Sequence, residues 1–181
     1  FADIFGRKRV FAAGIALYTL ASAACALAPN GLVLIGLRVV QGLGAAMNFG
    51  TGIAILSSVF PAGERGKVLG INVFFTYLGL VLGPVVGGFL TQHLGWHAVF
   101  LVVVPFGLLA WALVQFRLHG DWAGARGERF DVVGSVLYGL GLVLAMVGLS
   151  RLREGEGLVL IALGLTILVA SSAPIDQYII T

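Results

Sequence analysis

Long apolar stretches, separated by short polar segments, make up most of this chain. None of them alternates apolar and polar residues as a half-exposed strand would, so the pattern predicts helices. The stretches are about Val10–Ala28, Gly31–Phe60, Val68–Thr91, His97–Phe116, Val132–Ser150 and Leu158–Ala170. A helix needs about 20 apolar residues to cross a bilayer, and the first five stretches supply them while the sixth is short. We therefore predict an all-α fold, a polytopic membrane helical bundle whose first partner is the lipid bilayer.

Composition agrees with this interpretation. Hydrophobic residues make up 59% of the chain and charged residues 10%, and the mean hydropathy is +1.04. An average soluble domain is about 25% charged, so this chain has too few charges to cover a surface that faces water. Cys25 is the one cysteine, which excludes a disulfide within the chain.

The basic residues between the stretches predict the orientation. Eight of them lie in alternate segments, namely Arg7, Lys8, Arg9, Arg65, Lys67, Arg117, Arg126 and Arg129. The other segments hold only Arg151 and Arg153. The positive-inside rule makes the richer side cytoplasmic. The net charge of +3 therefore reflects topology, and we expect no nucleic-acid partner, because the charges are scattered and lack interleaved aromatic residues.

One basic residue lies inside a stretch. Arg38 is about eight residues into the second stretch, roughly 10 Å below the outer surface by helical rise. An arginine at such a depth costs several kcal/mol, so it is expected to face a cavity or a partner. Gln41 shares roughly its face, and Gly42 leaves room beside it. All eight acids lie in loops, at the edges of the stretches or in the tail, so we expect the carboxylate partner of Arg38 on a segment outside this sequence.

Glycines mark the third stretch. Gly79, Gly83 and Gly87 recur every fourth residue and form a stripe without side chains, next to Gly88. Such a stripe allows close backbone packing between membrane helices. Pro84 removes one backbone hydrogen bond and is expected to bend the helix. The run predicts a kinked, tightly packed membrane helix.

Two short polar segments on the predicted cytoplasmic side combine acidic, glycine and basic residues. The first contains Asp3, Gly6, Arg7 and Lys8, and the second contains Glu64 and Arg65. We expect both to be tight turns. Their carboxylates and guanidinium groups are candidates for an ion-pair network that holds one conformation, with topology anchors as the alternative.

Polar residues inside the stretches are candidates for a substrate cavity. They are Asn48, Asn72 and Thr76, together with Tyr77, and each could instead bond to a neighbouring helix. His93 and His97 have the i, i+4 spacing of metal ligands, but no third ligand is near, so we expect no metal site. No nucleotide-binding loop or nucleophile motif is present, which argues against an enzyme and against a bound cofactor.

Several of these segments together resemble the major facilitator superfamily, in particular its fourteen-helix drug–proton antiporter branch. Ala2-Asp3 with Gly6-Arg7-Lys8 is similar to part of the loop 2–3 motif. Leu37-Arg38 through Gln41-Gly42, followed by Gly44, is similar to the arginine motif of helix 4. Gly79, Gly83-Pro84 and Gly87-Gly88 are similar to the antiporter motif of helix 5. Glu64-Arg65-Gly66 resembles loop 4–5, and Phe130-Asp131 with Gly134 resembles the start of the extra seventh helix.

The resemblance implies a partial major-facilitator fold, about helices 3–8. Residues 1–118 would be helices 3–6 of the amino-terminal transmembrane domain, and 119–131 a cytoplasmic loop. Residues 132–172 would be two extra linker helices, with a polar tail at 173–181. The chain starts without methionine and its last stretch is short, so we expect a fragment whose remaining helices are its partners.

The resemblance also implies roles for these residues. Arg38 would take part in proton coupling, and Asp3, Arg7 and Arg65 would belong to a cytoplasmic latch. The helix 5 glycines would pack at the domain interface. The parent would sit in a bacterial cytoplasmic (inner) membrane and export amphipathic small molecules, such as drugs, in exchange for protons by alternating access. The alternatives are a metabolite exporter of the same superfamily and a non-transporting helical scaffold. A guanidinium facing lipid, or a glycine stripe that touches no neighbouring helix, would argue against efflux.

Overall fold

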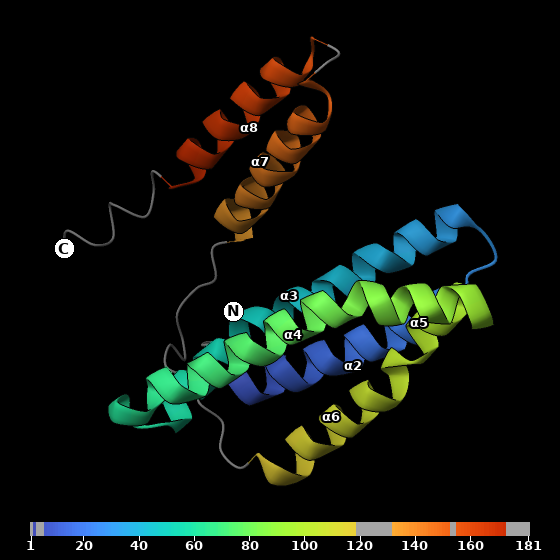
Figure 1. Cartoon of the computed structure of the whole chain (residues 1–181). Helices are drawn as coiled ribbons and strands as arrows, with labels where there is room; N and C mark the ends of the chain where they lie inside the picture. Colours follow the sequence, from blue (N-terminus) through green and yellow to red (C-terminus); the bar gives the residue numbers. More distant parts are fainter. Residues whose placement is uncertain (1, 3–5, 119–131, 153–154, 173–181) are drawn as a thin grey trace. The chain divides into compact units, whose positions relative to one another are not determined.

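The computed structural model describes residues 2, 6–118, 132–152 and 155–172, and these form helices joined by short turns (Figure 1). Five helices are long and apolar enough to cross a membrane, and a sixth, over Gly157–Ser171, is shorter. The predicted all-α membrane bundle is therefore confirmed. The chain divides into two compact units, residues 1–128 and 129–181. The predicted loop 119–131 and tail 173–181 lie outside the described residues.

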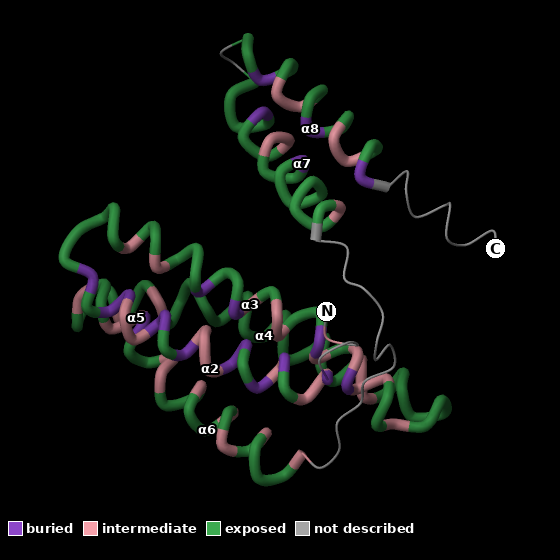
Figure 2. The backbone as a smooth tube through the Cα atoms, turned by 180° about the vertical axis from the view of Figure 1, so that it is seen from behind, coloured by how far each residue is buried: buried purple, intermediate pink, exposed green. Residues whose placement is uncertain are grey.

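The first unit is organised around its first long helix. It contains α2 (Arg7–Ala26), α3 (Gly31–Val59), α4 (Ala62–Leu94), α5 (His97–Leu101) and α6 (Val103–Arg117). α2 packs most extensively against α3, and also against α6 and α5. Buried residues therefore follow α2 along its length, whereas α4 and α6 have none (Figure 2). α2 is the core of this unit.

Local signals in the sequence set the ends of these helices. Asn30 caps α3, because its side-chain oxygen accepts a hydrogen bond from the Val33 amide at 3.0 Å. Gly6 precedes α2 with a φ of 100°, and Gly95 ends α4 with a φ of 82°. These positive φ values favour glycine, so both turns depend on the missing side chain.

The second predicted cytoplasmic turn is instead helical, which corrects the sequence interpretation. α4 begins at Ala62, directly after Pro61, and includes Glu64, Arg65 and Lys67. Proline suits the start of a helix, and Glu64 in the first turn complements the positive end of the helix dipole. At 33 residues, α4 is about 50 Å long and exceeds the roughly 30 Å hydrocarbon core, so its polar first turns can extend beyond it.

The fourth apolar stretch is one candidate membrane span, His97–Arg117, as predicted, and it consists of two helical segments. α5 ends at Leu101 and α6 begins at Val103, and Val102 between them keeps helical dihedral angles. Pro105 accounts for the irregularity, because it has no amide hydrogen to donate to the Leu101 carbonyl. By contrast, α4 continues through Pro84 without ending.

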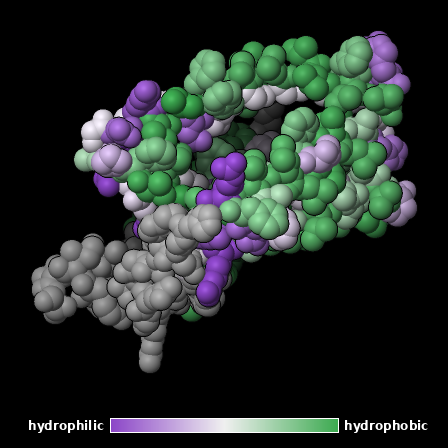
Figure 3. Space-filling view, turned by 90° about the horizontal axis from the view of Figure 1, so that it is seen from below, coloured by the Kyte–Doolittle hydropathy of each residue, from purple (hydrophilic) through white to green (hydrophobic). Residues whose placement is uncertain are grey.

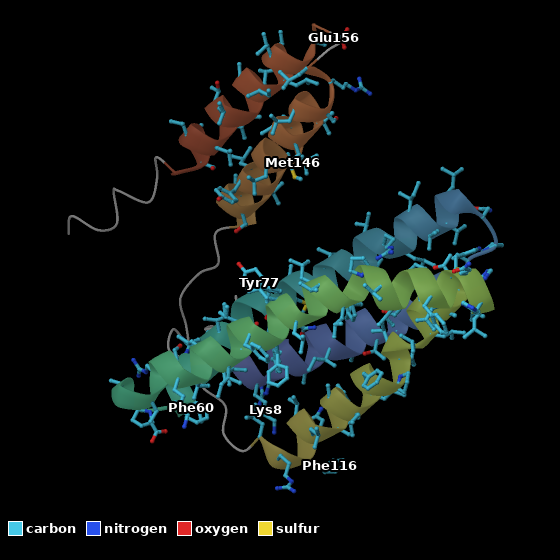
Figure 4. The ribbon with its side chains drawn as sticks, in the orientation of Figure 1. Lys8, Phe60, Tyr77, Phe116, Met146 and Glu156 are labelled. Atoms are coloured by element: carbon cyan, nitrogen blue, oxygen red, sulfur yellow. The ribbon has the colours of Figure 1, made fainter. Side chains whose placement is uncertain are left out.

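The helix ends of this unit that carry basic residues lie at the same end of the unit. Lys8 near the start of α2, Phe60 between α3 and α4, and Phe116 near the end of α6 lie toward the same end of the unit (Figure 4). The basic residues Arg7, Arg65 and Arg117 belong to these helix ends, as the charge count requires. Hydrophobic residues cover much of the face in Figure 3, which a hollow interrupts. Such an apolar surface suits lipid.

The second unit is a helical hairpin of α7 (Val132–Ser150) and α8 (Gly157–Ser172). Glycines seven residues apart line the contact on both helices: Gly141 and Gly148 on α7, Gly157 and Gly164 on α8. A Cβ atom on Gly148 would lie 2.7 Å from the Gly157 carbonyl oxygen. One on Gly164 would lie 2.7 Å from the Gly141 carbonyl oxygen. The two backbones therefore approach each other closely at two levels.

Adding one methyl group at this contact is expected to destabilise the hairpin. In Gly148→Ala, the new Cβ meets backbone atoms that cannot rotate away, so we expect a loss of about 1–3 kcal/mol in the free energy of unfolding. The measurement is the midpoint of helix loss by circular dichroism as denaturing detergent is titrated into micelles of mild detergent.

Gly139→Ala is the matched control on the same helix. A Cβ atom at Gly139 meets nothing within 4 Å, so the substitution should be neutral or stabilising, by up to about 1 kcal/mol of helix propensity. Equal midpoints for the two variants would show that the glycine contact contributes no packing.

Candidate functional site

The helix that carries Arg38 is held directly against α2. Gly44 of α3 faces Gly14 and Tyr18 of α2, and a Cβ atom at Gly44 would lie 2.7 Å from the Tyr18 amide nitrogen. The buried residues of α3 are Gln41, Gly44, Thr51 and Ile55. Their spacing of three, seven and four residues places them on one face. This contact fixes the rotation of α3 and thereby the place of Arg38.

Arg38 is the first functional candidate whose surroundings the structure shows. Its Nη1 donates a hydrogen bond to Oε1 of Gln41 at 3.1 Å. Nε2 of Gln41 donates to Oγ of Ser22 on α2 at 2.7 Å. The Ser22 hydroxyl in turn donates to the Tyr18 carbonyl at 2.7 Å. Arg38 and Gln41, which the spacing places on one helix face, are therefore hydrogen-bonded, and the chain of hydrogen bonds extends to the neighbouring helix.

An aromatic ring from α5 completes the surroundings of Arg38. The guanidinium carbon lies 4.7 Å from the centroid of the Phe100 ring, a cation–π distance. Phe100 is buried together with Cys25 and Ala26, and Leu34 and Leu37 pack against this cluster. The Arg38 residue as a whole is exposed in the described part of the chain. Its charge is therefore supported by neutral groups and remains accessible.

The three candidate cavity residues meet at one cavity. Asn48, Asn72 and Thr76 line a space of about 420 Å³ between α2, α3, α4 and α6. The other lining residues are Phe11, Phe49, Gly52, Ile53, Ile55, Leu56, Val114 and Leu118. None of the lining residues is charged. Tyr77, the fourth candidate, is exposed and does not line it.

Among the polar residues that line this cavity, Asn48 has an unpaired buried oxygen. Its Oδ1 is buried and has no hydrogen-bond partner within the described residues. A Cβ atom at Gly14 would collide with that oxygen, so the side chain rests against the bare backbone of α2. An unpaired buried oxygen is costly, so this position is set by the close packing of α3 on α2 at Gly14.

The glycine stripe of α4 does not behave as the sequence analysis expects. Within the described residues, a Cβ atom at Gly79, Gly83, Gly87 or Gly88 would meet nothing within 4 Å. The prediction of tight packing is therefore wrong for this part of the chain. By spacing, the stripe continues the face of Asn72 and Thr76, which borders the cavity, so open space lies in front of it. A bare helix face permits close approach but does not supply the partner. Among the described residues, a stripe that touches no neighbouring helix argues against efflux.

The predicted latch residues are only partly described. Asp3 lies outside the described residues. Arg7 donates from Nη1 to the Ala54 carbonyl at 3.1 Å and to Oγ of Ser58, near the end of α3. Its cation thus lies close to the negative end of a helix dipole. Arg65 donates from Nε to the Phe60 carbonyl at 3.0 Å. These contacts tie α2 to α3 and shape the following turn, and the latch itself stays a prediction.

The two histidines take separate positions. Nδ1 of His93 lies 2.9 Å from the Phe89 carbonyl oxygen, whereas His97 stacks on Trp96 with ring centroids 3.7 Å apart. Among the described residues, no group of three potential ligands is close enough to hold a metal ion. Neither histidine contributes to the Arg38 site.

A sequence model of the Major Facilitator Superfamily matches residues 1–179 of this chain. The chain belongs to the major facilitator superfamily. This multi-pass membrane protein thus has the membership that the resemblance of its motifs predicted. Members of the superfamily are transporters, so the membership favours transport over catalysis.

Similar proteins are named as transporters and as resistance proteins. The chain is 30% identical over 167 residues to the riboflavin transporter RibZ of Clostridioides difficile (strain 630), a match that covers 92% of this chain and 36% of that protein. It is 38% identical over 138 residues to the multidrug resistance protein Stp of Mycobacterium tuberculosis (strain CDC 1551 / Oshkosh), covering 76% and 26%. It is 39% identical over 149 residues to the multidrug resistance protein B homolog of the same strain, covering 82% and 27%. The chain thus spans about a quarter to a third of these relatives.

Two residues at the Arg38 site are missing from the sequence interpretation of this superfamily member. Ser22 lies in a run of alanines that reads as packing, and Phe100 lies in an apolar stretch. No spacing links either residue to Arg38, because they come from other helices. The only signals in the sequence that could have indicated these two residues are weak. They are the hydroxyl of Ser22 within an apolar helix and the ring of Phe100 four residues after Trp96.

Proposed function

We propose that this chain is part of a bacterial cytoplasmic-membrane exporter that moves amphipathic small molecules outward in exchange for protons. The proton gradient would supply the energy, with no cofactor and no covalent chemistry. Arg38 is the observation that carries the proposal. The contacts described for this guanidinium are an amide and a ring, both neutral, so it can interact with a carboxylate that gains and loses a proton.

The size and lining of the cavity support an amphipathic small molecule as the substrate. A volume of about 420 Å³ lies within the range of small-molecule sites. Its apolar wall with two amides and one hydroxyl suits a flat amphipathic compound that offers a few hydrogen-bonding groups. We place the substrate against Asn48, Asn72 and Thr76.

One observation favours a second candidate, a metabolite exporter. The residues around the cavity carry no charge, and Phe11 and Phe49 contribute aromatic rings. Such a lining would accept a neutral heteroaromatic compound at least as well as a lipophilic cation. A relative at 30% identity is named a riboflavin transporter, which fits that chemistry.

A flux experiment on the full-length transporter that carries this segment tests the proposal. We expect an imposed pH gradient across proteoliposomes to drive ethidium or riboflavin against its concentration gradient. A protonophore should abolish the accumulation, since no other energy source is present. Fluorescence of the trapped compound is the measurement, and the preferred compound separates the two candidates.

Empty liposomes and liposomes with the Asn72→Leu/Thr76→Val double variant are the controls. The variant removes two hydrogen-bonding groups at the cavity while keeping similar volume, so we expect KM to rise about tenfold or more. Accumulation that persists with the protonophore would exclude proton coupling. An unchanged KM would remove the cavity from the substrate path.

A further inference from the structure

We propose that Ser22 and Phe100 are positioning residues for Arg38, which hold its guanidinium in one place without neutralising it. This inference rests on the proposed function, because it concerns how the charge used for proton coupling is held. Neither residue belongs to the motif that contains Arg38, and each lies on another helix.

The hydrogen bonds run in one direction. The Ser22 hydroxyl has a single hydrogen and donates it to the Tyr18 carbonyl, so its oxygen acts as an acceptor toward Gln41. Gln41 must then present its amide nitrogen to Ser22 and its oxygen to Arg38. The reversed amide would place N–H groups against a cation. Ser22 therefore decides which end of Gln41 faces the guanidinium.

The chain of donors replaces a counter-ion. Arg38 donates to Gln41, Gln41 to Ser22, and Ser22 to a backbone carbonyl, so every oxygen faces back toward the positive charge. Hydrogen bonds aligned in this way polarise one another. Dipoles can solvate a cation, but they cannot cancel its charge.

Burial keeps this arrangement in place. Ser22 is 0% exposed and Gln41 is 4% exposed. Water therefore has little access to either group, and a different amide orientation would leave a buried donor or acceptor unpaired. The side chain of Gln41 is locked by α2, although it belongs to α3.

Phe100 fixes the second side of the guanidinium. Its ring is 7% exposed and packs with Cys25 and Ala26, so the ring cannot easily turn away. The guanidinium lies over the ring at 4.7 Å from its centroid. The same ring forms a T-shaped pair with Trp96, with centroids 6.1 Å apart. Guanidinium position is thus set by α2, α3 and α5 together.

On α2, α3 and α5, the helices that contact the guanidinium, no other titratable group holds it in place. On α2 they are Tyr18, which contributes its backbone carbonyl, and Cys25, which lies in the apolar cluster. Arg7, Lys8 and Arg9 stand at the far end of α2. His97 on α5 stacks on Trp96. Within the described residues, Arg38 is the one charged side chain of α3.

A displaced guanidinium should change the pH dependence of transport. A nearby cation lowers the pKa of a carboxyl group, so moving the cation away lets that pKa rise. Loss of positioning should therefore shift the pH profile of proton-driven efflux to more alkaline pH. A purely structural defect would lower the amount of active protein and leave the profile where it was.

The test uses Ser22→Ala in the full-length transporter in proteoliposomes. We expect the maximal rate at neutral pH to fall about tenfold, the profile to move to more alkaline pH, and KM for the transported compound to stay within about twofold. Ser22→Cys keeps the volume but offers a weak acceptor, so its effect should fall between wild type and Ser22→Ala. Phe100→Leu should shift the profile in the same direction.

Thr19→Ala is the matched control. Thr19 is on the same helix and 3% exposed, and its hydroxyl donates only to the Ile15 carbonyl, at 2.7 Å. Removing it should leave the pH profile unchanged. If Arg38→Ala abolishes coupling while Ser22→Ala and Phe100→Leu match Thr19→Ala, the positioning inference is overturned and the proposed function stands. If Arg38→Ala itself leaves coupling intact, the proposed function fails.

Discussion

Gly44→Leu is expected to separate α2 from α3 and to unfold the first unit. A Cβ atom at this position would lie 2.7 Å from the Tyr18 nitrogen, 3.0 Å from the Tyr18 Cα atom and 3.0 Å from the Gly14 carbonyl oxygen. All three are backbone atoms, so no side chain can rotate to make room. We expect a loss of about 3 kcal/mol in the free energy of unfolding, the upper end of the usual range for overpacking.

Gly50→Leu on the same helix is the matched control for that loss. A Cβ atom at Gly50 meets nothing within 4 Å, so leucine there should be tolerated. Unfolding of the chain in mixed micelles, followed by circular dichroism, measures both variants. Similar midpoints would mean that the helices cross elsewhere than at Gly14 and Gly44.

Arg38→Ala is expected to abolish proton-driven efflux by the full-length transporter. A carboxylate that exchanges protons would lose the cation that lowers its pKa. We expect a rate lower by about 100-fold, which corresponds to about 3 kcal/mol. Protein levels and binding of the transported compound should change little, because the side chain is exposed and does not line the cavity. The measurement is accumulation in proteoliposomes under an imposed pH gradient.

Two further variants are the controls for Arg38→Ala. Lys67→Ala also removes a positive charge but lies in the polar first turns of α4, so coupling should persist. Arg38→Lys keeps the charge but loses the planar group that lies over Phe100, and its rate should fall between wild type and Arg38→Ala. Efflux at the wild-type rate in Arg38→Ala would remove this arginine from the mechanism.

The apolar periodicity predicted the helices well, but it failed where polar residues extend a helix. The segment 61–67 reads as a turn because it contains two glycines and three charges, yet Pro61 and Glu64 supply a good helix start and the residues join α4. The stretch from His97 is one candidate span, as predicted, with an irregular residue, Val102, three positions before Pro105. Local propensity is a weak guide in a segment such as 61–67, because one favourable helix start outweighs the average of the segment.

Some residues of the candidate site could be found from the sequence, and others only from the structure. The sequence places Arg38 and Gln41 on one helix face, since three residues separate neighbours there, and the structure joins them by a hydrogen bond. Asn48, Asn72 and Thr76 could be named only as candidates, and the structure brings them to one cavity. Ser22 and Phe100 could not be found, because no periodicity connects residues on different helices. The sequence analysis does not single out the α7–α8 glycines, because nothing within either helix shows which backbone the glycines approach.

The sequence by itself determined that this protein is an all-α membrane bundle of the major facilitator superfamily, that its basic residues divide its loops into two sides, and that one arginine lies inside a span. These properties follow from hydropathy, charge and short motifs, which act within single helices. Only the tertiary structure decided which glycines bring backbones together, which helix face stays open, and which groups hold the guanidinium. Those outcomes depend on the rotation and separation of whole helices, and the energies that set them come from contacts between distant parts of the chain.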